Sequence, residues 1–528
     1  MSQTLCQNFD IVSFLHDFMN AAKSVALAIV FLLSALVPAV SVDAANDART
    51  DTDRGYLSEK WRAGLGTGLG ALNSIKSADI DADGEDELVF GNSQGYVHVL
   101  DWNASAGAFS EEFQSIDMGG AVKGLEIAQI DDDPQLEIAI GYNWNSDSGK
   151  VKIIDGISLL AEANWSSGVS WSHTQWTEGW PYGIAMGDLD GDNQTELGMG
   201  GDRGFLWVVD TETPEIYVGR DITSDEAEWY MDVGAKTGGG TLENTWGLTF
   251  GQFDDDEAME VAIGSKQGWV AIFDGETKEM QWKIDMDGSS GLDSLCYSMI
   301  SADLNGNGID AIVFGSDSDN ISLLLDDGTI SWSYTTGDKI QSAPSIINTG
   351  SEILICAGSK DDSFYCLTED GDLKFSYPTG GNVYTSPSAV EINGNTAIFF
   401  GSDDGFIYAV DVNGNNLNGW PQQTDGNIVG SIAFSDMDND GTPEVVAATD
   451  MGDVLAFNLD GSYVNYFPIS NGFPFSGSPM ITNLDEDGDL EIAAGSGGNL
   501  FVVDIKDMGS TTNYWNMYRG NERRTGYL

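Results

Sequence analysis

Short apolar runs alternate with polar turns along most of the chain. Runs such as Tyr96–Leu100 (YVHVL) and Trp269–Phe273 (WVAIF) have the alternating pattern that is typical of β-strands. Clusters of Gly, Asn and Asp separate these runs and predict turns. No segment between residues 60 and 528 shows a convincing helical period. The pattern therefore predicts an all-β protein.

One unit recurs along the chain: an acidic loop, an apolar run that ends in Gly, a short turn and a second apolar run. ADIDADGEDELVFGNSQGYVHVLD from Ala78 and SDMDNDGTPEVVAATDMGDVLAFNLD from Ser435 are two copies. The last loop position recurs in steps of 43 to 64 residues, at Glu87, Glu137, Glu196, Glu260, Ala311, Leu354, Ala397, Glu444 and Glu491. Nine tandem units of about four short strands thus fill residues 73–528. Such an array removes its exposed strand edges by radial closure into a β-propeller.

The units resemble two known groups of repeats. The acidic loops resemble the FG-GAP and VCBS-type repeats of integrin-like propellers. The segment Gly401–Pro421 (GSDDGFIYAVDVNGNNLNGWP) resembles the PQQ-like blade of quinoproteins. The resemblance covers residues from about 60 to 528 and implies a single β-propeller of about eight or nine four-stranded blades. It implies little about function, because propellers carry many unrelated activities.

The acidic loop reads D-x-D-x-D-G-x-x-E in its complete form. Oxygens at positions 1, 3 and 5 converge when the chain turns sharply, and Gly or Asn at position 6 accepts the positive φ that this turn needs. A carboxylate at position 9 then closes the cage. Oxygen ligands without His or Cys favour Ca²⁺. An EF-hand would place its closing Glu at position 12, but Phe90 and Met199 stand there in the first and third loops.

Four loops carry a complete or nearly complete set of ligands, and we predict a Ca²⁺ ion in each. The predicted ligands are Asp79, Asp81, Asp83 and Glu87; Asp188, Asp190, Asp192 and Glu196; Asp436, Asp438, Asp440 and Glu444; and Asn483, Asp485, Asp487 and Glu491. Solvated acidic turns are the alternative, but they would not explain acids on alternate residues. The loops that begin at Gln129, Gln252 and Asp303 are degenerate, and the sequence leaves their calcium binding open.

The N-terminus carries the only long apolar run, Val25–Val40, which follows Lys23 and precedes the small-residue stretch SVDAAND. This run is shorter than the roughly 20 residues of a membrane helix and matches a secretory signal. We therefore predict a signal peptide over residues 1–45, cleaved near Ala44 or Ala45, and a lead-in over residues 46–72. A retained N-terminal anchor is the alternative. Both predict a secreted or cell-surface protein.

The chain is strongly acidic, with 84 Asp and Glu against 22 Lys and Arg and a formal charge of -62. It is still 41% hydrophobic, so it is expected to fold. Its field repels phosphate, which excludes nucleic acid and anionic membrane surfaces as partners. Only His98 and His173 follow the predicted signal, too few for a His-based triad or zinc site. His98 lies in a strand pattern and is expected to be packed.

Two cysteines and the C-terminal segment suggest further structural features. Cys356 and Cys366 flank the turn KDDS and would face each other across a hairpin, either as a disulfide or as two buried thiols. The terminal WNMYRGNERRTGYL is expected to close the ring. Its cationic group would dock on an acidic surface through Arg519, Arg523 and Arg524.

These features predict a calcium-binding propeller for extracellular recognition or adhesion, with a glycan or a surface protein as ligand. The Trp-rich insertion Asn143–Tyr182 is expected to form part of the contact. We assign no catalytic residue and favour a binding protein over an enzyme. Two enzyme classes stay open: a quinone-dependent oxidoreductase, implied by the PQQ-like blades, and a calcium-dependent polysaccharide-acting enzyme. The sequence identifies neither the ligand nor the oligomeric state.

Overall fold

The computed structural model divides the chain into a unit at Met1–Asp53 and a unit at Arg54–Leu528, and the described residues all belong to the second unit. They run from 57 to 517. The longer stretches that are not described are 65–74, 116–120, 129–134, 155–168, 171–183, 190–195, 201–204, 210–228, 233–244 and 287–295. Among the described residues, no helix has the length and hydropathy that a membrane crossing requires.

The described strands form nine antiparallel sheets of four strands each, which we number as blades 1 to 9. Blades 1 to 4 contain β2 (Ile75–Ala78), β3 (Glu87–Gly91), β4 (Val97–Asn103) and β5 (Ala108–Gln114); β6 (Val122–Ala128), β7 (Glu137–Asn145), β8 (Ser148–Ile154) and β9 (Val169–Ser170); β10 (Ile184–Gly187), β11 (Glu196–Gly200), β12 (Phe205–Val209) and β13 (Trp229–Asp232); and β14 (Thr245–Gly251), β15 (Glu260–Ser265), β16 (Trp269–Asp274) and β17 (Met280–Asp285).

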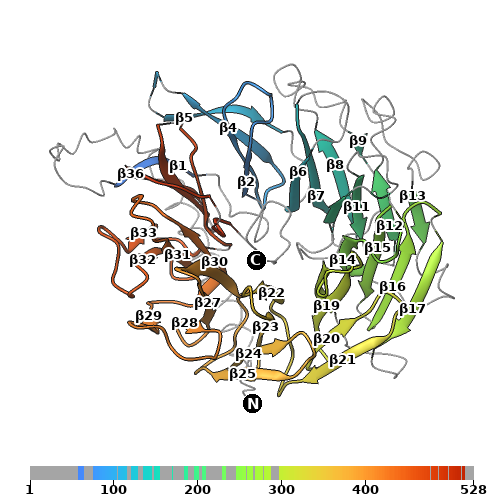
Figure 1. Ribbon diagram of the computed structural model, residues 1–528. Coiled ribbons are helices and arrows are strands. Elements are labelled where there is room, and N and C mark those ends of the chain that lie inside the picture. Colours follow the sequence, from blue (N-terminus) through green and yellow to red (C-terminus); the bar gives the residue numbers. More distant parts are fainter. Residues whose placement is uncertain are drawn as a thin grey trace, which may run out of the picture. The chain divides into compact units, whose positions relative to one another are not determined.

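Blades 5 to 8 have the same up-and-down order. They contain β18 (Cys296–Ala302), β19 (Ala311–Ser316), β20 (Asn320–Leu324) and β21 (Ile330–Thr335); β22 (Ser345–Asn348), β23 (Ile353–Ser359), β24 (Ser363–Thr368) and β25 (Leu373–Pro378); β26 (Ser388–Ile392), β27 (Asn395–Ser402), β28 (Phe406–Asp411) and β29 (Gln422–Gln423); and β30 (Ile428–Ser435), β31 (Glu444–Thr449), β32 (Asp453–Phe457) and β33 (Ile469–Ser470). Within this unit the blades follow one another around a ring, with the fourth strands, such as β17, β21 and β25, on the outer rim (Figure 1). The prediction of an all-β propeller is confirmed.

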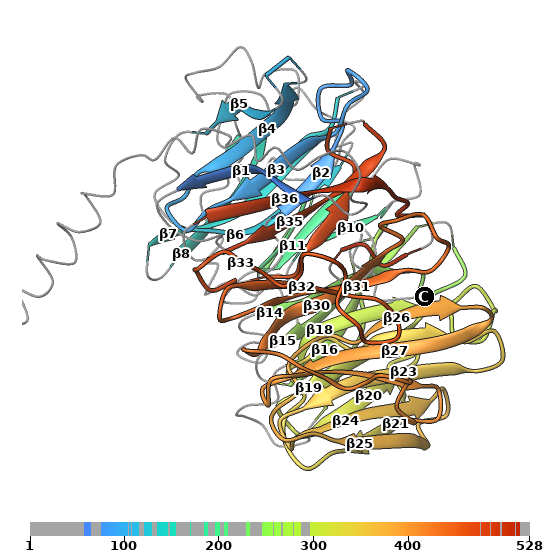
Figure 2. The ribbon, with the colours of Figure 1, turned by 90° about the vertical axis from the view of Figure 1, so that its left-hand side faces the viewer.

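Blade 9 closes the ring with a strand from the start of the unit. It contains β34 (Met480–Thr482), β35 (Asp489–Gly495) and β36 (Asn499–Met508), and β1 (Leu57–Gly64) is its fourth strand. β1 runs antiparallel to β36, beside which it lies in Figure 2. The expected lead-in of residues 46–72 therefore supplies the outer strand of the last blade.

Apolar side chains between adjacent blades form the core. Phe90 of blade 1 packs in one cluster with Leu500 and Val502 of blade 9, which joins the first blade to the last. The Gly that ends each apolar run has a steric reason. A Cβ on Gly91 would lie 2.2 Å from Val122 Cγ1 of the next blade, too close for any side chain.

The segment after β36 lies against blades 8 and 9. The amide of Phe434 donates to the carbonyl of Trp515 at 2.7 Å, and the amide of Ile481 donates to the carbonyl of Asn516 at 2.8 Å. Trp515 is buried in the core between blades 7 and 8. The three arginines expected to dock here lie outside the described residues, and so does most of the Trp-rich insertion.

The structure also bears on the predictions for the two cysteines of the blade 6 hairpin and for His98. Cys356 and Cys366 are directly opposite each other in β23 and β24 and form a disulfide, so the disulfide alternative is the correct one. His98 is buried, stacks on Phe90 and has its Nδ1 2.6 Å from Glu111 Oε1. It is a packed residue, as expected.

Candidate calcium sites in the blade loops

The acidic loops connect the first and second strands of the blades. In blade 1 the ladder pairs Ala78 at the end of β2 with Glu87 at the start of β3, and the loop lies between them. Blade 8 repeats this register with Ser435 and Glu444. Because both ends of the loop are fixed by the sheet, positions 1 and 9 are adjacent at the edge of the blade.

The loop of blade 1 turns sharply around its own carboxylates. Asp79 accepts hydrogen bonds from the amides of Asp83 (3.0 Å to Oδ1) and Gly84 (3.0 Å to Oδ2). Asp81 Oδ1 also accepts from the amide of Asp83 at 3.1 Å. Gly84, at position 6, has a φ of 101°. The conformation that the sequence predicts for position 6 is present.

The loop of blade 8 has the same geometry. Asp436 accepts from the amides of Asp440 (3.0 Å) and Gly441 (2.9 Å), and Asp438 accepts from the amide of Asp440 at 3.2 Å. Gly441 has a φ of 88°. Two loops that are more than 300 residues apart thus adopt one structure, which indicates that the D-x-D-x-D-G pattern determines it.

The closing glutamates are buried and point back into the loops. Glu87 Oε2 accepts a hydrogen bond from the amide of Ile80 at 2.7 Å, and Glu444 Oε2 accepts from the amide of Met437 at 2.7 Å. The two side chains belong to residues that are 2% and 3% exposed. Burial, together with the charges of the neighbouring loop acids, raises the pKa of each to about 8, against the hydrogen bond from the loop amide. A bound cation would relieve this repulsion.

Carboxylate oxygens from positions 1, 3 and 9 converge in both loops. Asp79, Asp81 and Glu87 each offer an oxygen within 4.8 Å of the others, and so do Asp436, Asp438 and Glu444. The position-5 residues, Asp83 and Asp440, lie outside these clusters, and each accepts an amide hydrogen bond two residues onward instead. The all-oxygen donor set fits Ca²⁺.

Blade 9 adds a fourth acid to those expected. Asp485, Asp487 and Glu491 converge with Asp489, and Asn483 Oδ1 accepts from the amide of Asp485 at 3.4 Å. Asp489 is 7% exposed, and burial, with the neighbouring Asp487 and Asp504, raises its pKa to about 8. Asp489 was not among the predicted ligands, although it continues the spacing of acids on alternate residues.

A lysine lies within the blade 9 cluster. Lys506 Nζ is hydrogen-bonded to Asp504 and lies 3.6 Å from Asp487 Oδ2 and 3.9 Å from Asp489 Oδ2. Burial lowers the pKa of Lys506, but its hydrogen bond to Asp504 and the nearby acids raise it on balance. This loop therefore contains an internal cation.

The other loops are described only in part. Asp188, Asp190 and Asp192 of blade 3 lie outside the described residues, and Glu196 is placed only as the first residue of β11. Most of the loop from Gln129 is likewise not described. In blade 5, both carboxylate oxygens of Asp303 accept loop amides, at 2.8 Å from Gly306 and from Gly308.

The degenerate loop of blade 4 brings three acids together. Asp254 and Asp256 converge within 4.8 Å with Asp274, which ends β16. The closing Glu260 is fully buried, and its Oε2 accepts from the amide of Phe253 at 2.5 Å. Burial, with the three aspartates, raises the pKa of Glu260 to about 8.

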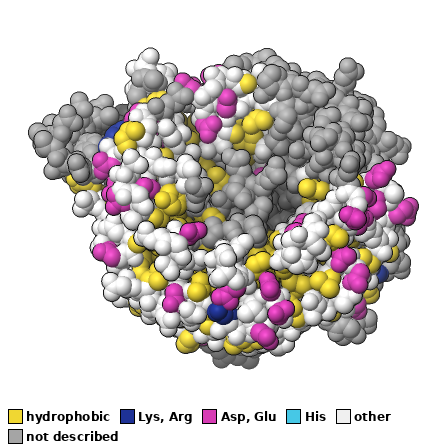
Figure 3. Space-filling view, in the orientation of Figure 1, with side chains coloured by type: hydrophobic (Ala, Val, Ile, Leu, Met, Phe, Trp, Pro, Cys, Tyr) yellow, Lys and Arg dark blue, Asp and Glu magenta, His cyan; other side chains and the backbone are white. Residues whose placement is uncertain are grey.

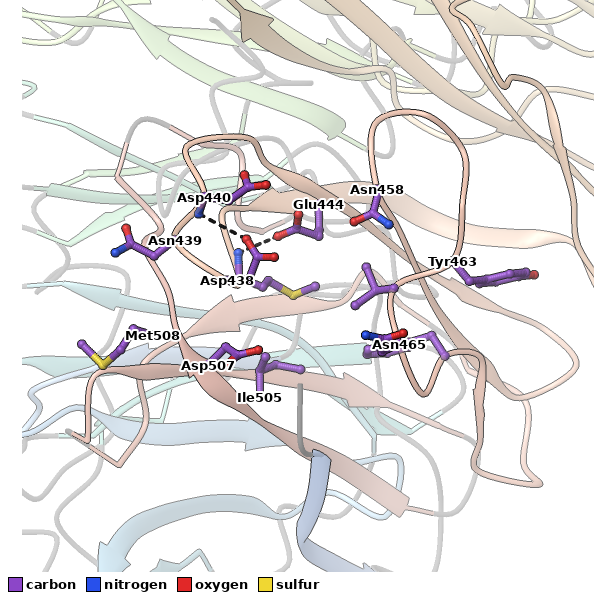
Figure 4. Close-up of a pocket in the computed structure, with 13 residues that line it drawn as sticks. Asp438, Asn439, Asp440, Glu444, Asn458, Tyr463, Asn465, Ile505, Asp507 and Met508 are labelled. Atoms are coloured by element: carbon purple, nitrogen blue, oxygen red, sulfur yellow. Dashed lines mark hydrogen bonds between the residues drawn. The ribbon is translucent and has the colours of Figure 1, made fainter. Parts of the chain in front are cut away.

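A pocket of about 640 Å³ opens beside the blade 8 loop (Figure 4). Asp438, Asp440 and Glu444 line one side. The other labelled residues are Asn439, Asn458, Tyr463, Asn465, Ile505, Asp507 and Met508. Tyr463 is 43% exposed and stacks on Phe457, with ring centroids 4.4 Å apart. The pocket thus combines an acidic loop with convergent carboxylates, side-chain amides and one aromatic ring that is stacked on Phe457.

The described surface is acidic. The face in Figure 3 shows many Asp and Glu side chains and few Lys or Arg among the coloured residues. This agrees with the formal charge of -62 for the whole chain.

A family match and one similar solved structure, Sqt1, support the propeller. Residues 262–379 match the family described as the lambda-carrageenase beta-propeller domain. Sqt1 from Saccharomyces cerevisiae is similar in structure with a TM-score of 0.50 and 14% identity, over 77% of this chain and 98% of Sqt1. BamB from Moraxella catarrhalis has a TM-score of 0.42 and 13% identity, over 85% of this chain and 98% of BamB. No curated protein matches the sequence.

Proposed function

We propose that this chain is a secreted or cell-surface propeller that uses calcium-bound loops to hold its blades and recognises an extracellular glycan. The convergent carboxylates of blades 1, 8 and 9 support the calcium sites. The apolar run before Ala44 supports export. The loop from Asp188 in blade 3 has the same sequence pattern and is assigned the same role.

The pocket of blade 8 is the observation that supports a glycan ligand. Sugar rings stack on exposed aromatic faces, and their hydroxyls hydrogen-bond to amides and coordinate calcium. Tyr463 supplies the aromatic face, and Asn458 and Asn465 supply the amides. Asp438 and Glu444 would hold the ion beside them.

The charge of the chain restricts which glycan fits. A field from a formal charge of -62 repels sulfated or carboxylated polymers and favours neutral sugars or amino sugars. The carrageenase match concerns blades 4 to 6, not this pocket. We therefore infer a neutral or amine-bearing glycan. A cationic surface protein is the competing ligand.

A glycan array on the full chain, followed by calorimetry in calcium and in EDTA, tests this proposal. Tyr463→Ala should weaken binding at least tenfold. Tyr384→Ala is the matched control, because Tyr384 is 40% exposed but does not line the pocket. An equal loss of glycan affinity in both variants would contradict a glycan site in this pocket. The absence of any bound glycan in calcium would contradict it as well.

The family match favours one second function, a polysaccharide-acting enzyme. The matched domain belongs to an enzyme class that acts on a polysaccharide. The test is release of new reducing ends from neutral and sulfated galactans by the purified chain in calcium. Time-dependent release that Asp438→Asn abolishes would favour this function over recognition alone.

A further inference from the structure

The closing glutamates lie opposite acidic residues on the third strand. Glu260 of β15 pairs directly with Asp274 of β16, and Glu491 of β35 pairs with Asp504 of β36. Leu88 faces Leu100 in blade 1, so Glu87 and Asp101 are the next pair in register. Like charges that are directly opposite on adjacent strands destabilise a sheet. Their recurrence requires a compensating group.

The pairing follows the presence of the closing glutamate. Among the described residues, the third-strand position holds an acid or its amide in every unit with the glutamate: Asp101, Asp274, Asn458 and Asp504. In sequence alone, Asp155 and Asp210 follow the corresponding apolar runs, but they lie outside the described residues. Three units lack the glutamate and have Ala311, Leu354 or Ala397 in its place. The third-strand residues in register with these positions are Leu325, Thr368 and Asp411. Asp411 is used in its own turn, where it accepts the amides of Asn413 at 2.8 Å and Asn415 at 2.9 Å.

Blade 4 shows what the third-strand acid can do. Its loop begins with Gln252 where complete loops have Asp, and Asp274 supplies the third converging carboxylate. Asp274 is held in place because its Oδ1 accepts from the amide (2.6 Å) and hydroxyl (2.7 Å) of Thr277. Its carboxylate is therefore positioned before any ion binds.

A second, independent observation at this loop is a buried oxygen without a partner. Glu260 is 0% exposed, and among the described residues its Oε1 has no hydrogen-bond partner. Its other oxygen is bonded to the amide of Phe253 inside the loop, so Oε1 lies on the loop side as well. The buried Oε1 of Gln252 also lacks a partner within the described part of the chain. Two oxygens are thus available beside three convergent aspartates.

We propose that blade 4 holds a Ca²⁺ ion bound by Asp254 and Asp256 of the loop together with Asp274 of the third strand. Glu260 lies outside the three converging carboxylates, and the Gln281 amide donates to Asp254 Oδ2 at 2.8 Å, so ion binding requires Gln281 to turn away. Glu260 and the Gln252 amide oxygen would then complete a set of five protein oxygens, and water would fill the remaining positions of the six to eight that Ca²⁺ takes. The inference rests on the calcium chemistry proposed for the complete loops. It adds a ligand that lies outside the nine-residue loop.

Calcium counting on the full chain tests this site. After equilibrium dialysis at a fixed free calcium concentration, bound calcium is measured by mass spectrometry for wild type, Asp274→Asn and Asp411→Asn. Asp411 is the matched control, because it has the same register position in a blade without the loop acids. We expect Asp274→Asn to bind one ion fewer than wild type and Asp411→Asn to bind the wild-type number.

Two further variants identify the ligands of the missing ion. The double variant with Asp254→Asn and Asp274→Asn should also bind one ion fewer, not two fewer, because both residues hold the same ion. Glu260→Gln keeps the acceptor for Phe253 and should weaken the same site. Circular dichroism and the melting temperature in EDTA check that each variant folds as the wild type does.

The outcomes separate this inference from the proposed function. If Asp274→Asn keeps the wild-type ion count while Asp81→Asn and Asp438→Asn each lose one ion, the blade 4 site is wrong and the calcium function remains. If a folded Asp411→Asn loses an ion as well, the third-strand argument fails. If the wild type binds no calcium, both the inference and the proposed function are wrong.

Discussion

The carboxylate of Glu87 and the backbone amide of Ile80 are joined by a 2.7 Å hydrogen bond that links positions 9 and 2 of the first acidic loop. Leu484 and Glu491 make the same bond at 2.7 Å in blade 9. The loop thus fixes the direction of a buried carboxylate before a metal binds. Removal of the metal should leave this carboxylate facing other acids.

Chelation should therefore destabilise the propeller. Sites with dissociation constants of about 10⁻⁴ to 10⁻³ M, typical of extracellular modules, would each add about 2.7 kcal/mol when calcium is at about 100 times the dissociation constant. Scanning calorimetry in calcium and in EDTA should show a melting temperature lower by many degrees in EDTA. Magnesium at equal concentration is the control, and an unchanged melting curve would mean that the loops are only acidic turns.

Substitutions within one loop should differ in effect. Asp438→Asn removes a converging carboxylate and should abolish the binding of one calcium ion. Asp440→Asn should weaken the site less, because Asp440 lies outside the cluster and caps Thr442 instead. Asn307→Ala in blade 5 should leave the ion count unchanged. Calcium titration of each variant measures these effects. Equal losses of calcium affinity in Asp438→Asn and Asp440→Asn would contradict the proposed set of ligands.

Lys506 should compete with calcium in blade 9. Its ammonium group lies 3.6 Å from Asp487 and 3.9 Å from Asp489. Lys506→Gln removes this internal cation and should raise the calcium affinity of the loop several-fold, while lowering stability in EDTA. Lys374→Gln is the matched control, since Lys374 pairs with Glu352 in the blade 6 loop, where no cluster of converging acids is found among the described residues. Calorimetric titration measures the calcium affinity of both variants. An unchanged calcium affinity in Lys506→Gln would show that Lys506 does not occupy the site.

A methyl group should not be tolerated at the end of a second strand. A Cβ on Gly401 would lie 2.5 Å from Ile428 Cβ of the next blade. Gly401→Ala should lower the free energy of unfolding by about 1–3 kcal/mol, the usual range for overpacking, or more if the backbone cannot shift. Denaturant unfolding measures this change. Wild-type stability in this variant would show that the blades can move apart.

Asp310 should cause a measurable pH dependence. Burial, with the charge of Asp303, raises the pKa of Asp310 from 3.8 to about 6, against a hydrogen bond from Gln252. The folded state therefore binds this proton more tightly, so its contribution to stability decreases as pH rises from about 4 to about 6. Asp310→Asn should melt above wild type at pH 7, and the difference should vanish near pH 4. A constant difference across this range would rule out titration of Asp310 as its cause.

Periodic features of the sequence predicted the fold and the loop sites, and features set by distant pairing were missed. The repeat spacing predicted nine units because each blade repeats the same order of loop, apolar run, turn and second run, even where the loop acids are lost. Asp274 is 20 residues from Asp254, so only the register of β15 and β16 brings them together. The segment Leu57–Gly64 has no acidic loop or Gly pattern, because an outer strand needs only backbone pairing.

The pairing of β1 with β36 makes ring closure depend on the order of synthesis. The first strand of this unit to be made must wait for more than 400 residues before its partner exists. Until β36 has been made, β1 and the incomplete last blade both have unpaired backbone edges. Such edges can pair with strands of other chains. A chain that stops before Asn499 cannot close its ring and is expected to aggregate. Ring closure is thus possible only after β36 has been made, so folding of this unit finishes late in synthesis.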